Sequence, residues 1–177
     1  MKDQRGFTAW FTGLPCSGKT TVADVVAERL KERGYRVERL DGDIVRKGLT
    51  SDLGFSKEDR DENIKRVTFV AKLLTRNEVA VLATFVSPYR ARRAKTREEI
   101  EEFIEVYTRT PVEVCIERDV KGMYKKALAG EISNFTGVDD PYEEPENPEL
   151  ILDTDKESIE ESAGKVLDKL VEMGYIE

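Results

Sequence analysis

The chain has 177 residues, a formal net charge of −7 at pH 7 and no histidine. This length predicts one domain, spanning residues 1–177, with a core that needs no metal or disulfide. The negative charge argues against a nucleic-acid-binding protein, and the lack of histidine excludes histidine-based acid–base catalysis and zinc sites of the usual kind.

The N-terminus and the two cysteines bear on the cellular compartment. The N-terminal residues are charged and fit no signal peptide, and no apolar run reaches membrane-spanning length. Cys16 and Cys115 form no C-x-x-C pair, and a structural disulfide is not expected. We therefore expect a cytoplasmic protein without a membrane partner.

A phosphate-binding loop is the strongest signal in the chain. The apolar run at 7–12 predicts a buried strand, and apolar residues recur at helical spacing between Val22 and Leu30. The pattern G-x-x-x-x-G-K-[ST] lies between them, and its residues are Gly13, Leu14, Pro15, Cys16, Ser17, Gly18, Lys19 and Thr20. A chance match at a strand–turn–helix corner is the alternative, but the flanking elements fall in register with the pattern.

The chemistry of phosphate binding explains the residue types in this loop. The glycines permit a turn whose backbone N–H groups point inward, and the N-terminus of the next helix adds partial positive charge. We expect Lys19 to reach the β- and γ-phosphates of a nucleoside triphosphate and the Thr20 hydroxyl to ligate Mg²⁺. The loop therefore predicts nucleotide binding but leaves the phosphoryl acceptor open.

The second predicted strand, 37–40, follows a helix that ends at Gly34, and it leads into Asp41-Gly42-Asp43. A carboxylate here would face the phosphate loop, where it could hold a Mg²⁺-bound water or accept a proton from an attacking hydroxyl. Asp-Gly is also a common turn dipeptide. The pattern by itself favours neither interpretation.

A long helix is predicted from Ser56 to Asn77, with Ser56 as its N-cap and Asp59 three residues later. Arg60 and Asn63 share a face of this helix because they are three residues apart. The arginine fork suits phosphate or sulfate. A solvated face with ion pairs along the helix is the ordinary alternative.

Strands are also predicted at 79–86 and 103–107, and an amphipathic helix from Ile159 to Val171 closes the chain. This alternation predicts an α/β fold of the P-loop NTPase type, with three layers, a mainly parallel central sheet and helices on both faces. Ligands in such folds bind beyond the carboxyl ends of the strands. We expect the functional residues to lie at that edge.

A cationic segment bracketed by glycines, 121–130, could close over phosphates and exclude water. We expect a mobile lid over approximately 119–137, and an ordinary exposed helix is the alternative. Phe55 and Phe135 are loop aromatics that could hold a flat base, although core packing is the usual fate of phenylalanine. The acidic, proline-rich stretch 139–148 has the composition of a surface loop.

Taken together and in order, these segments resemble the adenylylsulfate kinase (APS kinase) family. The match runs from about Gly6 to Asp153. It is carried by residues 40–43, 52–56, 58–60, 62–64, 87–90, 117–119, 121–122, 124–127, 134–137 and 141–148. The resemblance implies phosphorylation of the 3′-hydroxyl of adenosine 5′-phosphosulfate (APS) to give 3′-phosphoadenosine 5′-phosphosulfate (PAPS), with ATP as co-substrate and Mg²⁺ as cofactor.

The resemblance also implies roles at the matching positions. The catalytic residues would be Lys19, Asp43, Ser87 and Lys121, with Thr20 and Asp43 at the metal. The ATP site would consist of Gly13, Leu14, Pro15, Cys16, Ser17, Gly18, Lys19, Thr20, Thr21 and Arg118. The APS site would consist of Asp43, Arg46, Phe55, Arg60, Asn63, Val86, Ser87, Lys121, Gly122, Met123 and Phe135.

Two features of this chain bear on the implied mechanism. The family often marks the position of Ser87 as a phosphoserine intermediate, but such a serine needs an activating base. With no histidine in the chain, we expect direct in-line transfer. Pro15-Cys16 departs from the residues common in the family, and Pro15 removes an amide donor, yet we expect ATP binding to survive. The sequence leaves open whether the protein forms a homodimer.

Two other function classes remain as alternatives. Another small-molecule kinase, acting on a sugar, shikimate or a nucleoside monophosphate, would explain the phosphate loop but not the set of Phe55, Arg60, Asn63 and Phe135. A GTPase-like switch usually reads guanine through Asn-Lys-x-Asp, which this sequence lacks.

Overall fold

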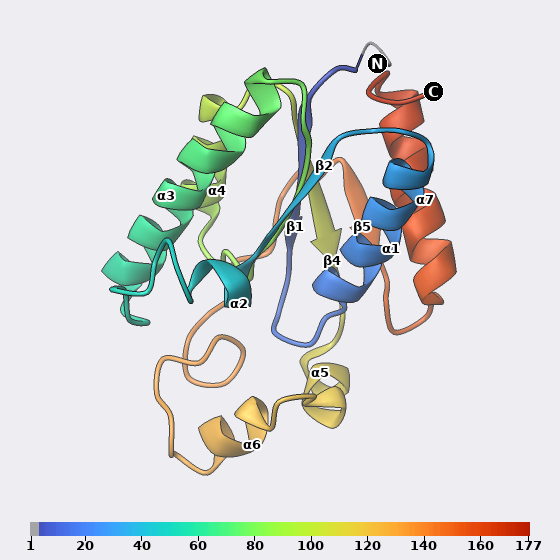
Figure 1. Ribbon diagram of the computed structural model, residues 1–177. Helices are drawn as coiled ribbons and strands as arrows, with labels where there is room; N and C mark the ends of the chain where they lie inside the picture. Colours follow the sequence, from blue (N-terminus) through green and yellow to red (C-terminus); the bar gives the residue numbers. More distant parts are fainter. Residues whose placement is uncertain (1–3) are drawn as a thin grey trace.

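The structure is a computed structural model that describes residues 4–177, and its centre is a parallel sheet with the strand order β2-β3-β1-β4-β5 (Figure 1). All four neighbouring strand pairs are parallel, which confirms the predicted sheet type. The strands are β1 (Phe7–Thr12), β2 (Val37–Asp41), β3 (Ala80–Thr84), β4 (Phe103–Thr108) and β5 (Leu150–Leu152).

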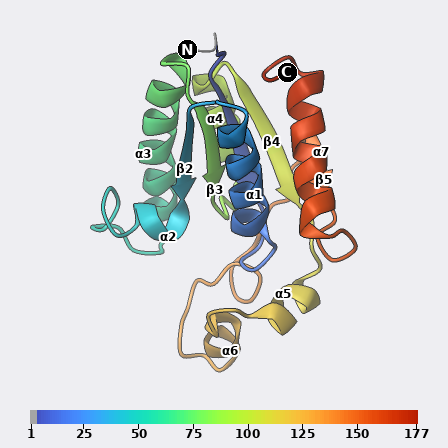
Figure 2. The ribbon, with the colours of Figure 1, turned by 45° about the vertical axis from the view of Figure 1, so that its right-hand side comes forward.

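Helices cover both faces of this sheet and complete the three layers. Helices α1 and α7 lie against one face, and α3 and α4 lie against the other (Figures 1 and 2). Helices α5 and α6 lie beyond the carboxyl ends of the strands. The helix bounds are α1 Lys19–Glu32, α2 Gly42–Val45, α3 Lys57–Arg76, α4 Arg90–Glu99, α5 Val112–Arg118, α6 Met123–Leu128 and α7 Ile159–Glu172.

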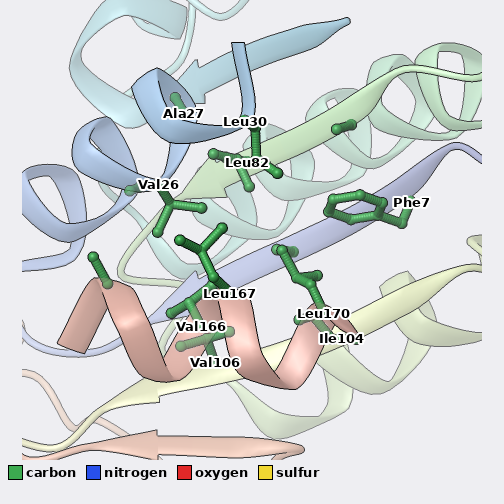
Figure 3. Close-up of a cluster of buried hydrophobic side chains, with 14 of the residues drawn as sticks. Phe7, Val26, Ala27, Leu30, Leu82, Ile104, Val106, Val166, Leu167 and Leu170 are labelled. Carbon is green, nitrogen blue, oxygen red and sulfur yellow. The ribbon is translucent and has the colours of Figure 1, made fainter. Parts of the chain in front are cut away.

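The larger core cluster lies between the sheet and the pair α1–α7. Val26 and Leu30 from α1 and Leu167 and Leu170 from α7 point toward Phe7 and the neighbouring strands (Figure 3). A second cluster packs α3 against the opposite face around the buried Trp10. Because β1 is covered on both faces, all six of its residues are buried, and the phosphate loop that follows it starts from a rigid strand.

The ends of several predicted elements differ from the structure. Strand β3 ends at Thr84 instead of residue 86, although the N–H of Phe85 still donates to the carbonyl of Phe11 at 3.2 Å. Strand β5 was not predicted. Its three residues pair with β4 from Val106 to Thr108 and follow a proline-rich stretch that gives no periodic signal.

The N-cap of α3 is confirmed, but its capping box is half formed. The Ser56 hydroxyl accepts the N–H of Asp59 at 3.1 Å. The Asp59 carboxylate turns outward and accepts the N–H of Gly54 at 2.9 Å. This second bond ties the preceding loop, which carries Phe55, to the start of the helix. Within residues 4–177, no helix has both the length and the apolar character to cross a membrane.

Candidate active site

The phosphate loop leaves β1 and enters α1 in the predicted position. A side chain at Gly13 would meet the Thr108 hydroxyl at 2.2 Å, so only glycine fits against the end of β4. Gly18 has a φ of 92°, in the left-handed region that glycine adopts most readily. The Ser17 hydroxyl bonds that of Thr108 at 2.7 Å. The end of β4 therefore fixes the shape of the loop, a role for Thr108 that the sequence did not indicate.

The Lys19 ammonium lies inside this loop. Its Nζ atom donates to the carbonyls of Gly13 at 2.9 Å and Leu14 at 2.7 Å, and the residue is buried. Burial disfavours the charged form and lowers the pKa of Lys19 to about 8. A polyphosphate would supply the negative charge that this buried cation lacks.

The Thr20 hydroxyl is held by a carboxylate at the end of β2. It donates to Oδ2 of Asp41 at 2.8 Å, and Thr84 at the end of β3 donates to the same oxygen at 2.9 Å. Partial burial opposes ionisation of Asp41, but these two hydrogen bonds, with that from the N–H of Asp43, prevail and lower its pKa. Asp41 is therefore an ionised acceptor beside the predicted metal ligand.

Asp43, which the sequence assigned to the metal, occupies a different position from Asp41. Its side chain is exposed and forms an ion pair with Lys121 from the predicted lid. The structure thus brings together two predicted catalytic residues, Asp43 and Lys121, but it places Asp41 against Thr20. The sequence pattern could not distinguish the roles of Asp41 and Asp43. Asp41 is the N-cap of α2 and points inward, whereas Asp43 in the first turn of that helix points outward.

Ser87 follows β3 and is buried, with its hydroxyl in a hydrogen-bond network. Trp10 Nε1 donates to Ser87 Oγ at 3.0 Å, and the Ser87 hydroxyl lies 3.2 Å from the Phe85 carbonyl and 3.1 Å from Thr12 Oγ1. The Arg93 guanidinium holds the Ser87 carbonyl at 2.6 Å. These contacts position the chain after Val86, and they engage the hydroxyl that a phosphoserine route would need free.

Two arginines predicted to bind the acceptor face a common region. The guanidinium of Arg46 stacks on the Phe55 ring at 4.3 Å and donates to the Gly54 carbonyl at 3.0 Å. Burial and then the nearby charge of Arg60 lower the pKa of Arg46. An anion bound beside Arg46 would stabilise its charged form.

Asn63 lies one turn along α3 from Arg60. It is buried, and its Oδ1 atom has no hydrogen-bond partner within the part of the chain that the structure describes. A buried carbonyl oxygen without a donor is costly. A ligand that offers an N–H or O–H group here would remove that cost.

The two predicted aromatic residues, Phe55 and Phe135, contact different neighbours. Phe55 is 59% exposed and contacts Arg46, whereas the Phe135 ring meets the ring of Tyr124 edge-on at 5.0 Å. Neither ring belongs to the two main core clusters. Stacking of both rings on an adenine therefore stays a prediction.

The segment predicted as a lid lies over the phosphate loop. Gly122 has a φ of 66° and caps α6, whose first residue is Met123. Tyr124 on this helix is fully buried and donates from its hydroxyl to the Pro15 carbonyl at 2.9 Å. The contact joins α6 directly to the phosphate loop, a role for Tyr124 that the sequence analysis did not predict.

Arg118 lies on the other side of the same loop. Its guanidinium donates to the Cys16 carbonyl at 3.2 Å and to the Thr154 carbonyl at 2.7 Å. Thr154 in turn donates from its hydroxyl to the Ser17 carbonyl at 2.7 Å. The segment after β5 therefore borders the loop, and the sequence missed it because it missed β5.

A cavity of about 720 Å³ lies beside this site. Leu14 of the phosphate loop is the one predicted site residue in its lining, and Gly137 comes from the predicted lid. Its charged lining consists of Asp139, Asp140, Glu144, Asp153, Asp155, Arg109 and Lys156. Carboxylates outnumber cations there, so phosphate chemistry fits the cationic region around Lys19, Arg46 and Arg60 better.

Metal binding by protein side chains alone has no support among residues 4–177, where no cluster of three or more His, Cys, Asp or Glu residues could hold an ion. The Thr20 hydroxyl beside the ionised Asp41 does fit a magnesium ion that arrives with a nucleotide. Mg²⁺ usually keeps several waters and is bound through few protein ligands plus substrate phosphates.

Comparisons with known proteins agree with this geometry. A sequence profile described as adenylylsulphate kinase matches residues 5–153. The adenylyl-sulfate kinase of Halothermothrix orenii is 64% identical over 176 residues, which cover 99% of this chain and 95% of that protein. The chain belongs to the adenylylsulphate kinase family. Another member, from Picosynechococcus, is 57% identical over 98% of both chains.

A solved member of the adenylylsulphate kinase family has the same fold. The APS kinase CysC of Mycobacterium tuberculosis, determined in complex with AMPPNP and APS, superimposes with a TM-score of 0.91 at 47% identity. The superposition covers 95% of this chain and 99% of that one. The family and the fold expected from the sequence are thereby confirmed, and the roles of individual residues remain predictions.

Proposed function

We propose that this protein transfers the γ-phosphoryl group of ATP to the 3′-hydroxyl of APS, giving PAPS and ADP. The observation that carries the proposal is the pairing of a phosphate loop with a second cationic region at the same sheet edge. That region contains Arg46, Arg60 and the unpartnered carbonyl of Asn63. A nucleotide with a divalent anionic end, such as APS, matches the two cations, and a hydroxyl or amino group of the same nucleotide would supply the donor that the Asn63 carbonyl lacks.

The donor half uses the loop from Gly13 to Thr21. Its amides and the Lys19 ammonium would bind the triphosphate and stabilise the negative charge that develops during transfer. The Thr20 hydroxyl would hold Mg²⁺, with Asp41 fixing the orientation of that hydroxyl. The bound ion would supply charge neutralisation between the phosphates. Arg118, at the edge of the loop, would lie near the base of ATP.

The acceptor half uses residues that follow β2 and β3. The guanidinium groups of Arg46 and Arg60 and the amide N–H₂ of Asn63 would bind the phosphosulfate end of APS, and Phe55 and Phe135 would stack on its adenine. Val86 and Ser87 would line this site, while Lys121, Gly122 and Met123 would close over it. In this arrangement the 3′-hydroxyl lies between the acceptor site and the phosphate loop.

The transfer itself would be direct. Asp43 is the exposed carboxylate between the two halves, and it would orient the 3′-hydroxyl and accept its proton. Lys121, its ion-pair partner, would leave that pair to neutralise transferring phosphoryl oxygens and to exclude water. The engaged hydroxyl of Ser87 supports a route without a phosphoserine intermediate.

An acceptor panel tests the proposal. The purified protein with Mg-ATP is offered APS, shikimate, gluconate or a nucleoside monophosphate in a coupled assay of ADP release. APS should be preferred by several orders of magnitude in kcat/KM. A preference for another acceptor, or stronger thermal stabilisation by GTP than by ATP, would refute the assignment.

A further inference from the structure

Asp140 lies in a tight turn, 134–140, in which the end of the predicted lid meets the start of the proline-rich segment. Its Oδ2 atom accepts a hydrogen bond from Arg60 Nη1 at 2.5 Å and one from the Tyr89 hydroxyl at 3.3 Å. The Arg60 side chain is 10% exposed and that of Asp140 is 23% exposed. This ion pair therefore lies largely away from water, where geometry and charge act more strongly than at the surface.

The turn has a scaffold of its own that does not involve Arg60. The neighbouring carboxylate, that of Asp139, accepts the backbone N–H groups of Asn134 at 2.8 Å and Phe135 at 2.7 Å. The N–H of Gly137 donates to the Asp140 carbonyl at 2.9 Å. The Asp140 carboxylate is therefore not needed to hold the turn together, and it accepts a hydrogen bond from Arg60 of α3 instead.

The donors of Arg60 are only partly used by this turn. A guanidinium has five N–H groups. Nη1 donates to Asp140 and to the Thr136 hydroxyl at 3.0 Å, and Nη2 donates to the Asn134 carbonyl. The Tyr89 hydroxyl also interacts with this guanidinium, so at least one of the five N–H groups remains for a ligand among the contacts of residues 4–177. The turn therefore holds the guanidinium of Arg60 through some of its N–H groups. The rest of the guanidinium can still donate hydrogen bonds to a bound anion.

We propose that Asp140 is a positioning residue for Arg60 in the phosphorylation of APS. It orients the guanidinium before the acceptor arrives, so that the remaining N–H groups of Arg60 meet the phosphosulfate. Without this carboxylate, the long arginine side chain would have to be ordered during binding, which weakens affinity. The inference rests on the proposed function, because it assigns Arg60 to the acceptor.

The alternative is that Asp140 competes with APS for Arg60, and it predicts the opposite change in APS affinity. If Asp140 occupied the place of the acceptor's anion, Arg60 would have to release it, and removing the charge would strengthen APS binding. The N–H group of Arg60 that these contacts leave unused favours positioning over competition, because the ligand can bind there without breaking the pair.

Asp140→Asn tests the inference, with Asp139→Asn as a matched control in the same turn. Both variants replace a carboxylate by an amide, but only Asp140 contacts Arg60. We expect Asp140→Asn to raise KM for APS about 10-fold or more, with kcat and KM for ATP changed less than about 3-fold. Asp139→Asn should change all three less than about 3-fold.

Two further measurements separate positioning from folding and from the proposed function. In the background of Arg60→Lys, Asp140→Asn should add less than about 2-fold to KM for APS, because the two residues act together. Calorimetric titration of APS should show the same loss of affinity without turnover. Thr136→Val, which removes another acceptor of Arg60 without changing charge, should raise KM for APS even if Asp140→Asn folds poorly.

The outcomes are distinguishable. If the wild-type protein phosphorylates APS and Asp140→Asn leaves KM for APS unchanged or lower, the positioning role is wrong and the proposed function stands. Equal effects of Asp139→Asn and Asp140→Asn would also contradict it, because they indicate disruption of the turn. If the wild-type protein neither binds nor phosphorylates APS, both the proposed function and this inference fail.

Discussion

The hydroxyl of Thr20 donates a hydrogen bond to the carboxylate of Asp41 at 2.8 Å. This contact joins the first turn of α1 to the end of β2, and the Thr84 hydroxyl joins the end of β3 to the same carboxylate at 2.9 Å. One buried carboxylate thereby orients the predicted Mg²⁺ ligand and ties three segments of the sheet edge together. The exposed Asp43, two residues on, has a separate partner in Lys121.

Asp41 and Asp43 should therefore differ when each is changed to asparagine. Asp41→Asn should raise the Mg²⁺ concentration for half-maximal activity about 10- to 100-fold, because it loosens the group that orients a metal ligand. Asp43→Asn should lower kcat about 10²- to 10⁴-fold and leave that Mg²⁺ concentration unchanged. Magnesium titrations of steady-state rate at saturating ATP and APS measure both effects. Identical responses of the two variants would contradict the division of roles.

Lys19→Met should abolish most activity while the fold survives. Removing one donor to the transferring phosphoryl group should cost about 10²- to 10³-fold in kcat. The buried ammonium has a pKa lowered to about 8, so an apolar side chain of similar length is compatible with its surroundings. The thermal midpoint without nucleotide should stay close to that of the wild type, and the stabilisation by Mg-ATP should disappear. Near-native turnover would contradict the role of Lys19.

The sequence predicted the place and surroundings of the phosphate loop well, because such a loop is a local motif. The spacing of Gly13, Lys19 and Thr20, with a strand before and a helix after, determines that local geometry. The bounds of α3 were also predicted within a residue at each end, because the N-cap Ser56 and a long apolar stripe mark it. Local signals of this kind need no information about distant segments.

Contacts between distant segments could not be read from the sequence. The pairing of Arg60 with Asp140 spans 80 residues, and that of Tyr124 with Pro15 spans 109. The difference between Asp41 and Asp43 depends on which one caps α2, and both carboxylates fit the same pattern. Tertiary packing decided each of these points, and the resemblance to a family supplied the acceptor site that spacing alone did not.

Ser87→Ala should remain active. Direct transfer needs no hydroxyl at this position, so kcat/KM should fall less than about 10-fold. Stability should decrease by about 1–3 kcal/mol, because the buried Trp10 N–H loses its acceptor. Coupled assays and urea denaturation measure the two effects. An obligatory phosphoserine would instead reduce the activity of this variant to background, and the wild type would retain label from radioactive ATP.

Glu149 should contribute stability that depends on pH. It precedes β5 and accepts hydrogen bonds from Arg97 at 2.9 Å and from the N–H of Glu105 at 2.6 Å. Burial opposes its ionisation, but the bonds from Arg97 and the Glu105 N–H prevail and lower its pKa from the ordinary value of a glutamate. A carboxyl with a lowered pKa stabilises the fold above its unfolded-state pKa and loses that effect as the pH falls.

Glu149→Gln should therefore be less stable than the wild type by about 1–2 kcal/mol at pH 7. The difference in unfolding free energy between the two proteins should shrink as the pH falls from about 6 to 3, because protonation removes the same charge from the wild type. Urea denaturation at a series of pH values measures this difference. A difference that stays constant across the series would contradict the role of the ionised carboxylate.

The identity of the phosphorylated product tests the central claim most directly. The protein is incubated with γ-labelled ATP, Mg²⁺ and APS, and the nucleotide product is isolated and its phosphate position determined by mass spectrometry and nuclear magnetic resonance. The proposed chemistry predicts stoichiometric transfer of the label to the 3′-hydroxyl, giving PAPS. Label found only as inorganic phosphate, or on any atom other than the 3′-oxygen, would contradict it.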